Sequence, residues 1–223
     1  MGHDQNIREV TMNRLTRMAG ISVLAALGIA AAPLPAAGAE GIYEGKTVRV
    51  LIGFAAGGGY DRYARQIARH IGKHLPGSPN VVAVNMPGAG SMKVANYLYN
   101  VAPKDGTHFG TFARGAPLFA FSGGAKQVRF DPLKLTWIGT SSSYKGEAYL
   151  MAVRKETGIE SFADMQRTKK EFNFAATGPG SDGHDVPLVL RNVFNINAQV
   201  VRGYPGGNTL YLAVDRGEMD ARM

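Results

Sequence analysis

The chain has 223 residues, 45% of them hydrophobic and 19% charged, a balance typical of a globular protein that can bury a core. It contains no cysteine, which excludes disulfide scaffolds, thiol nucleophiles and cysteine-bound metal centres. The formal net charge of +8 suits an anionic ligand, a nucleic acid or an acidic membrane surface equally well.

The N-terminal segment has the pattern of an export signal. Three arginines between residues 8 and 17 precede an apolar run at 18–32, and small residues follow at 37–39. The run is shorter than the ~20 apolar residues that a membrane helix needs. We therefore predict a signal peptide at 1–39, cleaved before Glu40, and a periplasmic mature protein. A retained anchor helix is the alternative.

From residue 47 onward, β-branched or apolar runs alternate with amphipathic stretches, which is typical of an α/β fold with a largely parallel sheet. The expected strands are 48–54, 81–84, 108–112, 135–140, 148–153, 172–176 and 198–202, with another beginning at Met219. The expected helices are 61–74, 91–100, 162–167, 185–194 and 209–216. Glycines and prolines between residues 113 and 134 favour loops and one short helix.

Two glycine-rich turns join a buried strand to a helix, at 54–61 and 176–182, and a third lies at 87–91. Glycine lets the backbone turn sharply, and the first turn of a helix has unpaired N–H groups and a partial positive charge. Each turn can therefore hold an anion, and in open α/β sheets ligands lie at such strand ends. One turn alone is better explained as simple strand-to-helix geometry, whereas three together favour a site.

A nucleotide site is the competing interpretation. Residues 53–58 have phosphate-loop spacing, but Gly59 and Tyr60 stand where Lys and a hydroxyl residue are needed. The G-x-G-x-x-G pattern at 178–183 follows a strand, and Arg202 ends the next one, so an exported NADP-type oxidoreductase is the alternative function. Pro179 inside the turn argues against it.

Other chemistry finds little support in the sequence. The five histidines lack metal-ligand spacing, and no serine has an evident histidine partner. Lysines and arginines are scattered and not clustered with aromatic residues. We expect no metal, no cofactor, no nucleic-acid partner and no enzymatic activity.

Several segments occur together in a characteristic order. They are VRVLIGFAAGGGYD at 48–61, NMPGAG at 85–90, VAPKDG at 101–106, FDP at 130–132, TGPGS at 177–181, GYPG at 203–206 and GEMD at 217–220. From Lys46 to Met223 the chain resembles the extracytoplasmic substrate-binding proteins of tripartite tricarboxylate transporters.

The resemblance implies an α/β fold of the two-lobed, periplasmic-binding-protein-like type (type II), with lobe one at 40–140 and lobe two at 141–223. It implies a monomeric, non-enzymatic receptor that binds a small carboxylate and delivers it to a permease of two integral membrane subunits. Relatives continue past their Gly-Glu-x-Asp motif, so we expect a C-terminally truncated chain with an incomplete second lobe. A non-functional fragment of a binding protein is therefore a further alternative.

The predicted site combines the turns with this resemblance. Its ligand-binding residues are Phe54, Ala55, Ala56, Gly57, Gly58, Gly59, Tyr60, Gly88, Ala89, Gly90, Ser91, Thr177, Gly178, Gly180, Ser181, Asp182 and Tyr204. Most would act through backbone amides, and Ser91, Thr177 and Ser181 through hydroxyls. Asp61 is expected to cap its helix. Relatives carry two prolines at 55–56 and a small hydroxyl residue at 60, and these departures argue against citrate as the solute.

Overall fold

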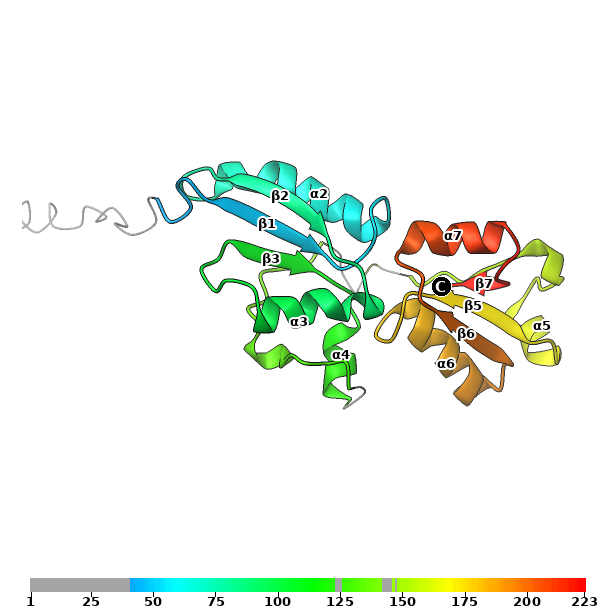
Figure 1. Cartoon of the computed structure of the whole chain (residues 1–223). Helices are drawn as coiled ribbons and strands as arrows, with labels where there is room; N and C mark the ends of the chain where they lie inside the picture. The colour runs from blue at the N-terminus through cyan, green and yellow to red at the C-terminus, as the bar shows by residue number, and fades with distance from the viewer. Residues whose placement is uncertain (1–40, 123–125, 142–145, 147) are drawn as a thin grey trace, which may run out of the picture. The chain divides into compact units, whose positions relative to one another are not determined.

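The computed structural model describes residues 41–122, 126–141, 146 and 148–223, and residues 41–223 form one compact unit. The predicted signal peptide lies outside the described residues. Two separate β-sheets organise the described chain, one of three strands and one of four (Figure 1). No helix in this described part is long and apolar enough to cross a bilayer.

The first sheet is entirely parallel, with strand order β2-β1-β3. Its strands are β1 (Thr47–Ile52), β2 (Asn80–Asn85) and β3 (His108–Thr111), and its helices are α2 (Gly59–Ile71) and α3 (Met92–Asn100). The central strand β1 is apolar and almost fully buried at its carboxyl end, as expected when helices cover both faces of a parallel sheet. Helices α2 and α3 lie on opposite faces of this sheet (Figure 1).

The second sheet has the order β4-β7-β5-β6, and only the β4–β7 pair is antiparallel. Its strands are β4 (Ala152–Val153), β5 (Phe172–Ala176), β6 (Ala198–Arg202) and β7 (Ala221–Arg222). The helices beside it are α5 (Phe162–Arg167), α6 (Asp182–Phe194) and α7 (Gly207–Asp215). Helices α6 and α7 flank β5 and β6 from opposite sides (Figure 1). Both sheets thus present the carboxyl ends of parallel strands to loops that lead into helices.

Each sheet has its own hydrophobic core. In the second sheet Phe172 and Phe174 are fully buried and pack with Met165, Leu190 and Ile196 from the surrounding helices and loops. The first sheet packs the alanines of α2 against β1 on one face, and Met92 and Phe130 among small residues on the other.

Short elements fill the connections. Among its described residues, the segment 113–134 contains one α-helix, α4 (Ala116–Phe121), as predicted. Four single 3-10 turns are η1 (Gly72–His74), η2 (Ala89–Ser91), η3 (Pro132–Lys134) and η4 (Lys155–Thr157).

Three local predictions were wrong. The expected strand at 148–153 is only two residues long, β4 at Ala152–Val153, because β7, with which it pairs, is itself two residues long. The apolar segment 135–140 forms no strand; Trp137 Nε1 instead donates a 3.0 Å hydrogen bond back to Pro132 O, which holds the chain in a local turn. Helix α6 begins at Asp182 and not at Asp185, because Ser181 O accepts from the amides of His184 and Asp185 and so starts the helix one turn earlier. The division into lobes at residue 140 stays a prediction.

Replacing Phe174 by alanine should lower the free energy of unfolding by about 3–4 kcal/mol, because it opens a cavity among fully buried neighbours. Urea unfolding followed by circular dichroism measures this change. The matched control is Val193→Ala on α6, where the side chain is 65% exposed, and its effect should stay within about 0.5 kcal/mol. Equal losses in both variants would contradict the assignment of the core.

Candidate functional site

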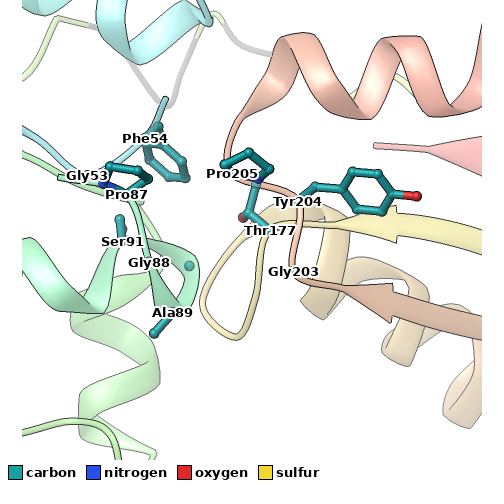
Figure 2. A pocket seen from close by; sticks show the side chains of 11 residues that line it. Gly53, Phe54, Pro87, Gly88, Ala89, Ser91, Thr177, Gly203, Tyr204 and Pro205 are labelled. Atoms are coloured by element: carbon teal, nitrogen blue, oxygen red, sulfur yellow. The ribbon is translucent and has the colours of Figure 1, made fainter. Parts of the chain in front are cut away.

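Loops from the carboxyl ends of four parallel strands enclose one cavity. The cavity has a volume of about 180 Å³ and is lined by residues 53–54 after β1, 87–91 after β2, 177 after β5 and 203–205 after β6. Figure 2 shows Phe54 and Pro87 on one side, with Thr177 and Pro205 on the other. The site therefore combines loops from both sheets, as expected for ligand sites at strand ends.

Beside this cavity the backbones of two turns are in direct contact, with no side chain between them. A Cβ atom on Gly90 would lie 2.7 Å from Pro179 O, and one on Gly178 would lie 2.8 Å from Gly90 N. Both glycines also have positive φ, 62° at Gly90 and 155° at Gly178, which other residues rarely adopt. The 87–91 and 176–182 turns can approach this closely only because glycine stands at both positions.

Asp61 holds the turn after β1 in place. Its carboxylate accepts hydrogen bonds from Gly57 N at 2.9 Å, Arg65 Nε at 2.9 Å and Asn85 Nδ2 at 2.8 Å. Asn85 Nδ2 also donates to Phe54 O at 2.9 Å. The predicted capping role was wrong: Asp61 is the third residue of α2, and the N-terminus of this helix has no side-chain cap. The carboxylate instead ties α2 to the loop that follows β1 and to the last residue of β2.

Hydrogen bonding outweighs burial at this carboxylate. Burial alone would raise the pKa of Asp61, but the bonds from Arg65, Gly57 and Asn85 favour the charged form more strongly, and the pKa lies below its ordinary value of 3.8. The ionised carboxylate is neutralised locally by Arg65, so the turn keeps its shape without presenting an unpaired negative charge.

Tyr60 lies behind Phe54. Their rings stack with centroids 4.4 Å apart, and the Tyr60 hydroxyl accepts a hydrogen bond from Arg114 N at 3.2 Å. Burial raises the pKa of the Tyr60 hydroxyl, and the bond from Arg114 only partly offsets this effect. Tyr60 therefore supports the cavity wall formed by Phe54 and does not line the cavity itself.

The three predicted hydroxyl ligands differ in their hydrogen bonding. Ser181 Oγ donates to Gly178 O at 2.6 Å, and Ser91 Oγ accepts from Ala113 N at 2.7 Å. Thr177 Oγ1 is buried, and no hydrogen-bond partner for it exists among the described residues. Such a hydroxyl costs free energy until a partner arrives. Thr177 is therefore the one of these three residues whose hydroxyl has no hydrogen-bond partner within the described chain.

The structure brings together part of the predicted set. The members that line the cavity are Phe54, Gly88, Ala89, Gly90, Ser91, Thr177 and Tyr204, and Gly178 lines an adjoining hollow. The residues 55–60 and 180–182 lie outside both linings.

The predicted residues outside the cavity make contacts between the two sheets' loops. Ala55 N donates to Pro205 O at 2.8 Å, and Ala56 O accepts from Asn208 Nδ2 at 3.2 Å. Asp182 forms an ion pair with Arg114 at 3.6 Å. These residues join the loops that surround the cavity.

Four lining residues were missed in the sequence: Gly53, Pro87, Gly203 and Pro205. Each stands within three residues of a strand's carboxyl end, and that position was the available signal. Tyr204 was predicted, but Figure 2 shows its ring extending away from Phe54 and Pro87. Burial, and next the Glu218 carboxylate, raise the pKa of its hydroxyl.

The G-x-G-x-x-G turn is covered where a pyrophosphate would lie. Gly90 packs against Pro179 O, and a Cβ atom on Gly115 would lie 2.6 Å from Gly180 O. Asp185 Oδ1 accepts from Gly180 N at 3.3 Å, which places a carboxylate at the same helix start. The geometry therefore gives the nucleotide alternative no support. Within the described chain, no group of three or more side chains could hold a metal ion.

Comparison with solved structures identifies the fold. A structure described as a periplasmic transporter matches 80% of this chain and 59% of its own, with 20% identity and a TM-score of 0.62. MatC from Rhodopseudomonas palustris, solved with bound malate, matches 78% of this chain and 58% of its own, with 22% identity and a TM-score of 0.60. The periplasmic binding protein BugD matches 79% of this chain and 57% of its own, with 16% identity and a TM-score of 0.58.

These neighbours confirm the predicted periplasmic-binding-protein-like α/β fold. The chain spans less than three fifths of the length of each of them. No protein-family model matches the chain, and no curated protein matches it by sequence. The neighbours are solute-binding and transport proteins, and the role of this chain has to be argued from its own cavity.

Replacing Asp61 by asparagine should lower the free energy of unfolding by about 2 kcal/mol at pH 7, because charged hydrogen bonds to a carboxylate that is 5% exposed are lost. Since the folded-state pKa is lowered, the carboxylate stabilises the fold above pH 3.8, and this contribution disappears as the pH falls through the folded-state pKa. Urea titrations at pH 7 and pH 3 measure both effects.

The control for this experiment is Asp215→Asn, at the exposed end of α7, which should leave stability nearly unchanged. If Asp61→Asn lowers the free energy of unfolding as much at pH 3 as at pH 7, the charge of the carboxylate is not what stabilises the turn.

Proposed function

We propose that this chain is an extracytoplasmic receptor that binds a small carboxylate solute in the cavity between the strand-end loops. One observation carries the proposal: Thr177, which lines the cavity, has a buried hydroxyl that lacks a hydrogen-bond partner among the described residues. A carboxylate oxygen that accepts this proton would remove the cost of the unpaired hydroxyl.

The opposite wall supplies further donors. The Ser91 hydroxyl accepts from Ala113 N, which leaves its own proton for a ligand oxygen. The 87–91 turn leads into α3, and although Met92 N already donates to Ala89 O, the start of the helix carries a partial positive charge that favours an anion. A carboxylate between Thr177 and this turn would be held from both sides by neutral donors, and bonds to an ionised acceptor are the stronger kind.

The lining favours binding over chemical transformation. It consists of glycines, prolines, hydroxyl residues, and aromatic or small apolar residues. These groups can recognise a negative charge and exclude water without making or breaking a covalent bond. Structural neighbours with malate or adipate bound support the same ligand chemistry.

We further propose the cellular setting that the sequence implies. The signal at 1–39 would direct the chain to the periplasm, and lobes at 40–140 and 141–223 would close on the solute. A monomeric receptor would then deliver it to an integral membrane permease of two subunits. The periplasmic neighbours support this proposal at the level of fold.

Titration calorimetry of the purified chain against a panel of mono-, di- and tricarboxylates and aromatic acids tests the proposal directly. We expect saturable, one-to-one binding of at least one carboxylate. If no member of the panel gives a heat of binding, the proposed receptor function is wrong.

Replacing Thr177 by valine should weaken binding of the best carboxylate about tenfold, because one hydrogen bond to an ionised group is lost. The same change should leave the melting temperature equal or higher, since it removes a buried hydroxyl that lacks a partner in the described chain. Calorimetry and thermal unfolding give the two readouts, and Thr177→Ser is the control that keeps the hydroxyl. Loss of stability without loss of affinity would assign Thr177 a purely structural role.

A further inference from the structure

A second hollow adjoins the cavity. Its volume is about 410 Å³, and it shares Ala89, Thr177 and Gly203 with the first cavity. Arg202 and Gln127 line only the second hollow. Because three lining residues are common to both, a ligand held at Thr177 can extend from one hollow into the other.

Arg202 and Thr177 lie at the same edge of the second sheet. The parallel register of β5 and β6 pairs Ala176 with Arg202, one position before Thr177, and both Thr177 and Arg202 line the second hollow. Neighbouring strands are about 4.8 Å apart, which is within the length of one small ligand. The sequence position of Arg202 at the end of β6 therefore places a cation next to the proposed carboxylate site.

Arg202 is the one charged residue that lines either hollow in the described structure. Its side chain is exposed, and within the same described residues it forms neither an ion pair nor a side-chain hydrogen bond. The arginines that structure the surrounding loops differ from it, since Arg65 is paired with Asp61 and Arg114 with Asp182. An unpaired guanidinium on the wall of a hollow is suited to a carboxylate, which it can bind with two parallel hydrogen bonds.

We infer that Arg202 is a specificity-determining residue that binds a second anionic group of the solute, while the first is held at Thr177. This inference rests on the proposed receptor function. The two subsites differ physically: the Thr177 subsite offers neutral donors, and the Arg202 subsite offers a full positive charge. The solute class is therefore a short chain with a carboxylate at each end, and Arg202 discriminates it from the corresponding monoacid.

The test compares ligands that differ by one charge. Calorimetry of the full chain would use succinate against its monoamide and adipate against its monoamide, which keep length and nearly keep shape. The unmodified protein should bind one of the diacids at least tenfold more tightly than its monoamide. In Arg202→Gln this ratio should fall below threefold, and Arg202→Lys should restore part of it. The matched control is Arg216→Gln on the exposed end of α7, which removes the same net charge.

Each outcome decides a different point. A diacid preference that survives Arg202→Gln would overturn the role of Arg202 while leaving the receptor function intact. An equal fall of the ratio in Arg216→Gln would overturn it as well, because the preference would then come from the net charge of the molecule. Failure of the unmodified chain to bind any diacid or monoamide, with no binding across the wider carboxylate panel, would overturn both the receptor function and this inference.

Discussion

The contact between the backbones at Gly90 and Gly178 is the constraint on which the cavity depends. Each glycine has a positive φ, and at each a Cβ atom would come within 3 Å of the other turn's backbone. Side chains at these positions would separate the loop after β2 from the loop after β5. Thr177 follows β5 directly and adjoins Gly178, so its distance from the 87–91 turn is set by the same contact.

The cavity is lined by uncharged residues, whereas the loops around it are held by ion pairs. Asp61 is held by Arg65 and by two further donors, and Asp182 is paired with Arg114. These carboxylates fix loops without repelling an anion in the cavity, because each negative charge has its own counter-charge. The polar groups that line the cavity are therefore uncharged peptide and hydroxyl groups. Arg202, in the adjoining hollow, is the exception.

Regular elements were predictable where local pattern and tertiary packing agree. The elements at 162–167, 172–176 and 198–202 have the predicted bounds. Helix α5 begins where predicted because Ser161 caps it by accepting from Asp164 N. Strands β5 and β6 pair along their whole length, which gives them the same number of residues. The segment 135–140 is equally apolar but forms no strand, since a side-chain bond from Trp137 to Pro132 bends it. Short apolar runs carry no information on whether a partner strand stands beside them.

The loops that line the cavity could be identified from local pattern, because glycines and a helix start directly after a strand mark the carboxyl end of that strand wherever it lies. Which atoms of those loops face the cavity follows from how the loops pack against one another. Gly57 N is bonded to Asp61, Ser181 Oγ to Gly178 O, and the Tyr204 ring extends away, whereas Thr177 Oγ1 keeps no partner within the described chain. Strand pairing also places Arg202 opposite Ala176, and so near Thr177, which is 25 positions earlier in the sequence. The two hydrogen bonds join residues only three or four positions apart, but whether each forms depends on how the surrounding loops pack, and residue spacing alone does not fix that packing.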